Sequence, residues 1–128
     1  MKKTGILHPE IMHLITGIGH TDCIVLADKG YPVPDGPHRI NIGLTENIPT
    51  VPQVLRAIEQ EMTVDRIICT EEMRDISPDR LDIIQTLYPD IRIDVVSHLQ
   101  FKEMSRLAKG VIKTGDTCPF ANLMLVSG

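Results

Sequence analysis

Residues 17–28 of the chain are Gly17-Ile18-Gly19-His20-Thr21-Asp22-Cys23-Ile24-Val25-Leu26-Ala27-Asp28. The glycines follow an apolar helical pattern, and glycine is the residue that most often ends a helix. The run from Cys23 to Ala27 is short and continuously apolar, which is the pattern of a strand buried on both faces. Polar side chains stand before and after this run. The stretch therefore predicts a helix followed by a central strand, with groups capable of chemistry at both ends of the strand.

Helix and strand patterns alternate along the rest of the chain. Helix starts are predicted at Pro9, Val51, Ser77-Pro78 and His98. Thr50 with Gln53, and again Ser97 with Gln100, form the capping-box pattern of a helix N-terminus. Further strands are predicted at 39–44, 67–69, 91–96, 111–112 and 123–126.

This alternation indicates the α/β class. The 39–44 strand alternates polar and apolar residues, and the last two apolar runs are joined only by a turn around Thr114-Gly115-Asp116. We therefore expect a mixed sheet with helices packed on its faces. At 128 residues the chain is most simply one domain, residues 1–128, which can bury about two-thirds of its unfolded surface.

Composition excludes several classes of protein. The chain is 42% hydrophobic but only 3% aromatic, so its core must be aliphatic. A net charge of −4 gives no basic surface for nucleic acid or for an anionic membrane. No apolar run is long enough to span a bilayer, and the N-terminal apolar run is broken at His8-Pro9, too early for a signal peptide. We expect a cytoplasmic protein that binds neither nucleic acid nor membrane.

Candidate chemical groups follow from the position of polar residues at strand ends. In open α/β sheets, sites form beyond the strand ends, where loops and helix N-termini meet. Asp28, Glu71, Glu72 and His98 each follow a predicted strand. His20 instead precedes a strand and follows a helix, whose negative C-terminal end favours an imidazolium that can act as a general acid.

Each candidate also fits a purely structural role. His20 can cap the preceding helix, and Asp28 can accept loop N–H groups in an Asx-turn. Glu71 and Glu72 fit a solvated pair, and His98 fits the first turn of a capped helix. We interpret Asp22 as a residue that only stabilises the turn at 19–22.

Metal and nucleotide sites are not indicated. The five histidines show no HxH, HxxxH or HExxH spacing, so a metal would need ligands from distant segments. Gly17-Ile18-Gly19 lacks the third glycine of a dinucleotide fingerprint and precedes a strand instead of following one. The three cysteines form no CxxC pair and none lies on an evident electropositive loop. What remains is an acid/base-capable polar cluster that indicates neither a metal nor a nucleotide.

Ordered motifs along nearly the whole chain resemble the D-ribose pyranase family, the sugar mutarotases of ribose-uptake operons. These motifs are Met1-Lys2-Lys3, Gly5-Ile6-Leu7, Gly19-His20-Thr21-Asp22, Asp28-Lys29-Gly30-Tyr31-Pro32-Val33-Pro34, Glu61-Met62, Glu71-Glu72, His98, Phe101-Lys102, Thr114-Gly115 and Pro119-Phe120-Ala121-Asn122. The related fucose mutarotases share Gly-His and a strand-end aspartate, but the Asp-x-Gly-x-Pro-x-Pro loop resembles the ribose branch.

The resemblance implies an isomerase that interconverts the pyranose and furanose forms of D-ribose by general acid/base chemistry without a cofactor. It also implies a homo-oligomer, a ring-shaped decamer with sites at subunit borders. The family's proton donor falls on His20. Its substrate contacts fall on Asp28, His98, Phe120, Ala121 and Asn122.

Two departures from the family pattern bear on activity. Phe120 stands where the family usually has tyrosine, so one hydroxyl at the sugar is absent. This leaves two alternatives open: a catalytically weak sugar-binding or regulatory relative, and a mutarotase of another monosaccharide such as fucose. Lys29, where relatives tend to have a small residue, adds a positive charge that we expect to lower the pKa of Asp28.

Overall fold

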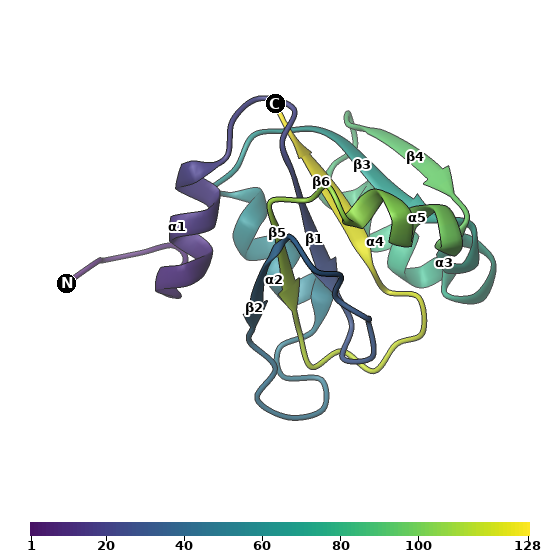
Figure 1. The fold of residues 1–128 in the computed structure, drawn as a ribbon, viewed down its shortest axis with the longest axis horizontal. Coiled ribbons are helices and arrows are strands. Elements are labelled where there is room, and N and C mark those ends of the chain that lie inside the picture. Colours follow the sequence, from purple (N-terminus) through teal and green to yellow (C-terminus); the bar gives the residue numbers. More distant parts are fainter.

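A computed structural model describes residues 1–128 as one six-stranded sheet with five helices (Figure 1). The helices are α1 (Pro9–Gly17), α2 (Val51–Glu59), α3 (Glu71–Ile76), α4 (Pro78–Leu87) and α5 (His98–Ser105). The strands are β1 (Cys23–Ala27), β2 (His38–Asn41), β3 (Val64–Thr70), β4 (Arg92–Val96), β5 (Gly110–Lys113) and β6 (Leu123–Ser127).

The sheet is mixed, which confirms the predicted fold class. Its strand order is β2-β5-β1-β6-β3-β4, and only β6 runs antiparallel to its neighbours β1 and β3. The carboxyl ends of the other five strands therefore meet at one edge of the sheet, together with the start of β6. The loops and helix N-termini at this edge carry most of the candidate residues.

The central strand β1 is buried on both faces, as its continuous apolar sequence predicts. Ile24 and Leu26 belong to a cluster of 21 buried residues, which α1, α2, α3 and α4 help to form. Val25 and Ala27 belong to a cluster of nine on the other face, where α5 contributes Phe101 (Figure 1). None of the helices has the length and apolar character that crossing a membrane requires.

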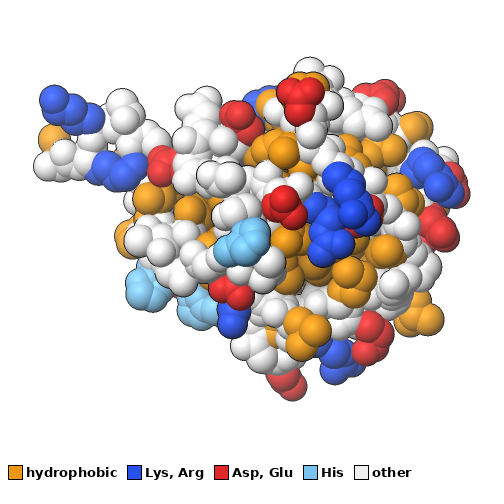
Figure 2. All heavy atoms as spheres, turned by 90° about the horizontal axis from the view of Figure 1, so that it is seen from above, with side chains coloured by type: hydrophobic (Ala, Val, Ile, Leu, Met, Phe, Trp, Pro, Cys, Tyr) orange, Lys and Arg blue, Asp and Glu red, His pale blue; other side chains and the backbone are white.

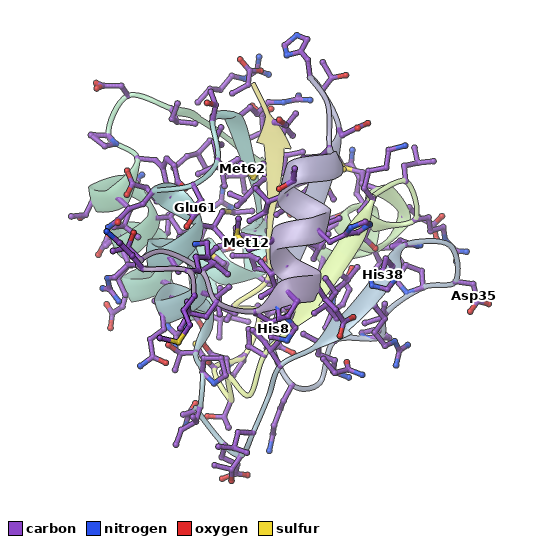
Figure 3. All side chains as sticks on the ribbon, turned by 90° about the vertical axis from the view of Figure 1, so that its left-hand side faces the viewer. His8, Met12, Asp35, His38, Glu61 and Met62 are labelled. Carbon is purple, nitrogen blue, oxygen red and sulfur yellow. The ribbon has the colours of Figure 1, made fainter.

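The N-terminal segment contacts the turn after α2, and α1 contacts the start of β2 (Figure 3). The Ile6 N–H donates to Glu61 Oε1 at 2.8 Å, and Lys2 Nζ lies 3.5 Å from the same oxygen. His38 Nε2 at the start of β2 lies 3.3 Å from Glu10 Oε2 on α1. Ile11 and Leu14 of α1 pack in the larger core cluster, which holds the helix against the sheet. Residues 18–22 then connect α1 to the amino end of β1.

Three details differ from the sequence predictions. The segment after Thr70 is the short helix α3, since Thr70 Oγ1 accepts the Met73 N–H at 3.0 Å as an N-cap. A helix of six residues is too short to show an apolar period. The last two strands are not neighbours, because β1 lies between β5 and β6. Leu107 continues the helical spacing of the apolar residues Phe101 and Met104, which predicts that it is buried, but it is 82% exposed because α5 ends at Ser105.

The two predicted capping boxes also differ in outcome. Thr50 and Gln53 form a complete capping box at the start of α2. Ser97 Oγ accepts the Gln100 N–H at 3.1 Å, which is only half of a capping box. Ser77 precedes α4 without capping it, because its hydroxyl donates to the Pro119 carbonyl at 2.8 Å.

Candidate functional site

A cavity of about 200 Å³ opens at the carboxyl end of β1. Three segments line it: the loop after β1, the first residue of α5 and the loop before β6. Its lining residues are Asp28, Gly30, Tyr31, Pro32, His98, Pro119, Phe120 and Asn122. The proline-rich loop after β1, residues 29–37, thus forms one wall of the cavity.

Asp28 and Asn122 form a reciprocal pair in this cavity. The Asp28 N–H donates to Asn122 Oδ1 at 2.8 Å, and Asn122 Nδ2 donates to Asp28 Oδ2 at 3.1 Å. The Gly30 N–H donates to Asp28 Oδ1 at 2.9 Å, which is the Asx-turn that the sequence left open. Each carboxylate oxygen accepts one of these bonds and keeps a further lone pair for a ligand.

The surroundings of Asp28 raise the pKa of its carboxyl group. Burial is the main cause, and the negative charge of Asp116 adds to it, while hydrogen bonds from Gly30 and Asn122 and the nearby His98 oppose it. The prediction that Lys29 lowers this pKa is therefore wrong in its result. Lys29 Nζ instead lies 2.8 Å from Glu46 Oε1, on the exposed side of the loop. A carboxylate with a raised pKa is a better proton acceptor than an ordinary aspartate.

His98 is held at the start of α5 by Glu72. Both carboxylate oxygens of Glu72 accept the His98 N–H, at 2.8 and 3.1 Å. The imidazole lies edge-on to Tyr31 and to Phe120, with ring centroids 6.4 and 5.1 Å apart. His98 Nδ1 is buried and has no hydrogen-bond partner in the protein. Because buried polar atoms are almost always paired, we expect this nitrogen to bind a partner that the protein itself does not supply.

Aromatic rings form the apolar side of the cavity. Phe120 has a φ of 54°, in the left-handed region that bulky residues rarely adopt, so surrounding contacts must hold it there. The Tyr31 hydroxyl donates to Ser105 Oγ at 2.8 Å inside the protein. Tyr31 therefore presents its ring to the cavity. Polar groups on one side and rings on the other suit a small molecule with several hydroxyls and an apolar face.

Two of the predicted site residues do not line the cavity. Ala121 is 1% exposed and packs in the larger core cluster. His20 is exposed at the amino end of β1, whereas Asp28 follows its carboxyl end. At about 3.3 Å per residue, the chain from Asp22 to Asp28 alone spans about 20 Å. One chain therefore does not bring His20 to the cavity.

The other candidate residues, Asp22, Glu71 and Glu72, do not line the cavity. Asp22 Oδ2 accepts the Gly19 N–H at 2.9 Å, which confirms its predicted role in the turn. Glu71 is exposed. Glu72 was predicted only as a strand-end carboxylate, because its contact to His98 joins residues 26 positions apart. Tyr31, Pro32 and Pro119 were not predicted as lining residues, although the first two belong to the proline-rich loop.

A larger hollow, about 380 Å³, lies at the other edge of the sheet. It is lined by His13, Leu14, Gly17, Ile18, Asp22, His38 and Lys109. Its two histidines are exposed. No group of three or more His, Cys, Asp or Glu side chains in the protein is arranged to hold a metal ion. The raised pKa of Asp28 and the unpaired Nδ1 of His98 make the smaller cavity the stronger candidate site.

Comparison with known proteins identifies the family of the chain. Residues 1–128 match the family described as the RbsD / FucU transport protein family. The chain belongs to this family. It is 42% identical to the D-ribose pyranase of Geobacillus thermodenitrificans over 128 residues, 100% of this chain and 97% of the relative. The resemblance inferred from the sequence motifs is thereby confirmed.

Two solved structures of relatives are also similar. The structure of Bacillus subtilis RbsD complexed with D-ribose matches with a TM-score of 0.96 at 35% identity, over 100% of this chain and 98% of that one. The fucose mutarotase of Streptococcus pneumoniae in complex with L-fucose matches with a TM-score of 0.76 at 25% identity, over 95% and 93% of the two chains. Both relatives carry a monosaccharide.

Proposed function

We propose that the protein is a D-ribose pyranase, an isomerase that interconverts the pyranose and furanose forms of D-ribose. The observation that carries this proposal is the reciprocal Asp28–Asn122 pair beside His98 in one small cavity. The curated relatives at 35–42% identity bear the same name. A chain with the fold of Bacillus subtilis RbsD at a TM-score of 0.96 offers a sugar the same framework.

The reaction needs only positioned proton donors and acceptors. Ring opening breaks the bond between C1 and the ring oxygen, as the anomeric hydroxyl loses a proton and the ring oxygen gains one. The open aldehyde closes again when a different hydroxyl adds to C1 with the reverse proton transfers. Groups placed for such transfers typically accelerate a step about 10² to 10⁴-fold. The sugar loses one proton and gains one in each direction, without a change of oxidation state, and no cofactor takes part in this scheme.

Each residue has a role in this proposal. Asp28 accepts hydrogen bonds from sugar hydroxyls, and Asn122 both orients Asp28 and binds the sugar. His98 offers Nδ1 to a hydroxyl, and Phe120 packs against the C–H face of the ring. Ala121 takes part through its backbone, since its side chain lies in the core.

His20 acts as proton donor in this scheme only if a second copy of the chain supplies it. It lies at the other end of β1 from Asp28, so a homo-oligomer would complete the site. The edge that carries His20 has a surface suited to such contact. There Arg66 and Lys109 lie among apolar side chains that include Met104, and Figure 2 shows lysines and arginines surrounded by apolar atoms. The decamer and the cytoplasmic location remain predictions.

NMR saturation transfer on D-ribose tests the function. We expect magnetisation to pass between pyranose and furanose anomeric protons much faster with protein than in buffer. Exchange equal to that in buffer, with ribose still bound, would instead identify a sugar-binding relative without catalytic activity. The full signal must survive a chelator, since a metal-dependent enzyme would lose it.

A mutarotase of a deoxy sugar is the second candidate. The apolar side of the cavity, formed by the rings of Phe120 and Tyr31 with Pro32, can receive a methyl group as well as a C–H face. The fold is also similar to that of a fucose mutarotase with bound L-fucose. The same experiment with L-fucose decides: faster catalysed exchange for L-fucose than for D-ribose would favour this candidate.

A further inference from the structure

The β5–β6 loop, residues 114–122, carries Phe120 and Asn122 into the cavity without a helix or strand of its own. Asp116 lies in its middle and is fully buried. Its N–H donates to Thr114 Oγ1 at 3.1 Å, and its carbonyl accepts the Lys29 N–H at 3.0 Å. The backbone of Asp116 thus joins the β5–β6 loop to the residue that follows Asp28.

The Asp116 carboxylate joins the same loop to two helices. Oδ2 accepts from the Val51 N–H at the start of α2 at 2.8 Å and from Arg80 Nη1 on α4 at 2.6 Å. Oδ1 accepts from Arg80 Nη2 at 3.1 Å and from the Cys118 N–H of its own loop at 2.9 Å. A bidentate contact from arginine fixes the orientation of a carboxylate as well as its position.

The Asp116 carboxylate can be buried because Arg80 neutralises its charge. A buried carboxylate is strongly unfavourable unless it is paired and hydrogen-bonded. Burial alone would raise the pKa of Asp116, but the bonds from Arg80, Cys118 and Val51 outweigh burial and hold this pKa below its usual value. Arg80 itself is only partly exposed, with 20% of its side-chain surface accessible. The pair is therefore an internal anchor and not a surface contact.

We propose that Arg80 and Asp116 are positioning residues of the sugar site: their buried ion pair holds the β5–β6 loop so that Asn122 lies opposite Asp28. Neither side chain lines the cavity, so both act through Asn122 and the loop after Asp28. The Ser77 hydroxyl, which donates to the Pro119 carbonyl, adds a second anchor from the segment before α4. The link to sugar turnover rests on the proposed function, whereas the link to the geometry of Asn122 does not.

The test uses two variants of the full chain. Arg80→Met removes the charge, whereas Arg80→Lys keeps the charge but not the bidentate contact. The readouts are the side-chain amide resonance of Asn122 in ¹⁵N-labelled protein and the KM for D-ribose in the exchange assay. We expect Arg80→Met to shift the resonance and to raise the KM about ten-fold, the effect of one charge-assisted hydrogen bond. Arg80→Lys should shift the resonance less and raise the KM about three-fold.

Arg92→Met is the matched control. Arg92 pairs with Asp94 in an exposed contact at the amino end of β4, the opposite edge of the sheet from the cavity. Its loss should leave both readouts unchanged. The KM is the decisive kinetic readout, because a variant that merely unfolds in part loses active molecules and keeps its KM.

A folded Arg80→Met protein with the wild-type resonance or the wild-type KM overturns the proposal. If Arg80→Met does not fold, Arg80→Lys decides in the same way. If the wild-type protein does not catalyse exchange, the proposed function fails on its own. The dissociation constant for D-ribose then replaces the KM. If D-ribose does not bind either, the Asn122 resonance alone decides whether Arg80 positions the loop.

Discussion

Asn122 and Asp28 make two hydrogen bonds to each other although they lie 94 residues apart in the sequence. The amide oxygen of Asn122 accepts the Asp28 N–H, and its amide nitrogen donates to the Asp28 carboxylate. β1 and β6 are antiparallel neighbours, so the end of one strand lies beside the start of the other. The pair therefore combines a backbone anchor with the orientation of an acidic side chain.

Asn122→Ala should weaken D-ribose binding about ten-fold, because it removes a direct contact and frees the Asp28 carboxylate to turn. Binding is measured by titration of the protein with D-ribose. Asn41→Ala is the matched control, because Asn41 is an exposed asparagine on β2. This variant should bind D-ribose with the wild-type affinity. Wild-type affinity in Asn122→Ala would show that the pair is not part of the sugar site.

The rule that sites form beyond the strand ends predicted part of this candidate site, but it missed Asn122 for a physical reason. Asp28 and His98 each follow a strand, and both line the cavity. Asn122 precedes a strand, and only the resemblance to a family singled it out. Because β6 runs antiparallel to β1, its start, and not its end, lies at the edge that holds the site. Strand direction is a tertiary property that short apolar runs do not encode.

The local patterns that predicted well are those whose cause is local. The apolar run Cys23–Ala27 forms β1 with the predicted bounds, and Thr50 with Gln53 forms the predicted cap. Asp116 was predicted only as part of a turn. Its burial depends on Arg80, 36 residues earlier, so no neighbouring residue indicates it.

His20→Ala should lower the exchange rate about 10² to 10⁴-fold while D-ribose binding largely persists, because the variant loses a proton donor and not a sugar contact. Saturation transfer gives the rate and titration gives the affinity. His13→Ala, another exposed histidine, is the matched control and should exchange at the wild-type rate. An unchanged rate in His20→Ala would remove His20 from the mechanism.

Mixed oligomers test whether His20 acts on the cavity of a second copy. We expect His20→Ala and Asp28→Ala to be nearly inactive alone. When the two chains assemble together, some sites combine a wild-type His20 with a wild-type Asp28 from the other chain, so part of the activity should return. No recovery in a mixture proven to co-assemble would contradict a site shared between copies. Sedimentation of the wild-type protein gives the number of subunits.

Asp116→Asn should lower the free energy of unfolding by about 3 kcal/mol at pH 7, the effect of breaking a buried ion pair. The pKa of Asp116 in the folded protein lies below 3.8, the value of a free aspartate. The stability that it contributes is therefore complete above this value and is lost as the pH falls through the lower, folded-state pKa. Urea unfolding should show the difference between wild type and variant shrinking as the pH drops below about 4.

The control for this prediction is Asp75→Asn. Asp75 pairs with Arg74 in an exposed contact, so its loss should change the free energy of unfolding little at any pH. A difference between wild type and Asp116→Asn that stays constant down to pH 3 would show that the charge of Asp116 is not what stabilises the loop.

Phe120→Tyr should raise the rate of exchange, because it adds a hydroxyl to the aromatic wall beside His98, whose ring centroid lies 5.1 Å from that of Phe120. Phenylalanine and tyrosine have the same backbone preferences, so the φ of 54° imposes no additional strain on the variant. The free energy of unfolding should change by less than about 0.5 kcal/mol, which urea unfolding checks. Saturation transfer with D-ribose and with L-fucose measures the effect on each sugar. A rate at or below that of the wild-type protein on both sugars would show that the absent hydroxyl does not limit turnover, and that Phe120 acts through its ring alone.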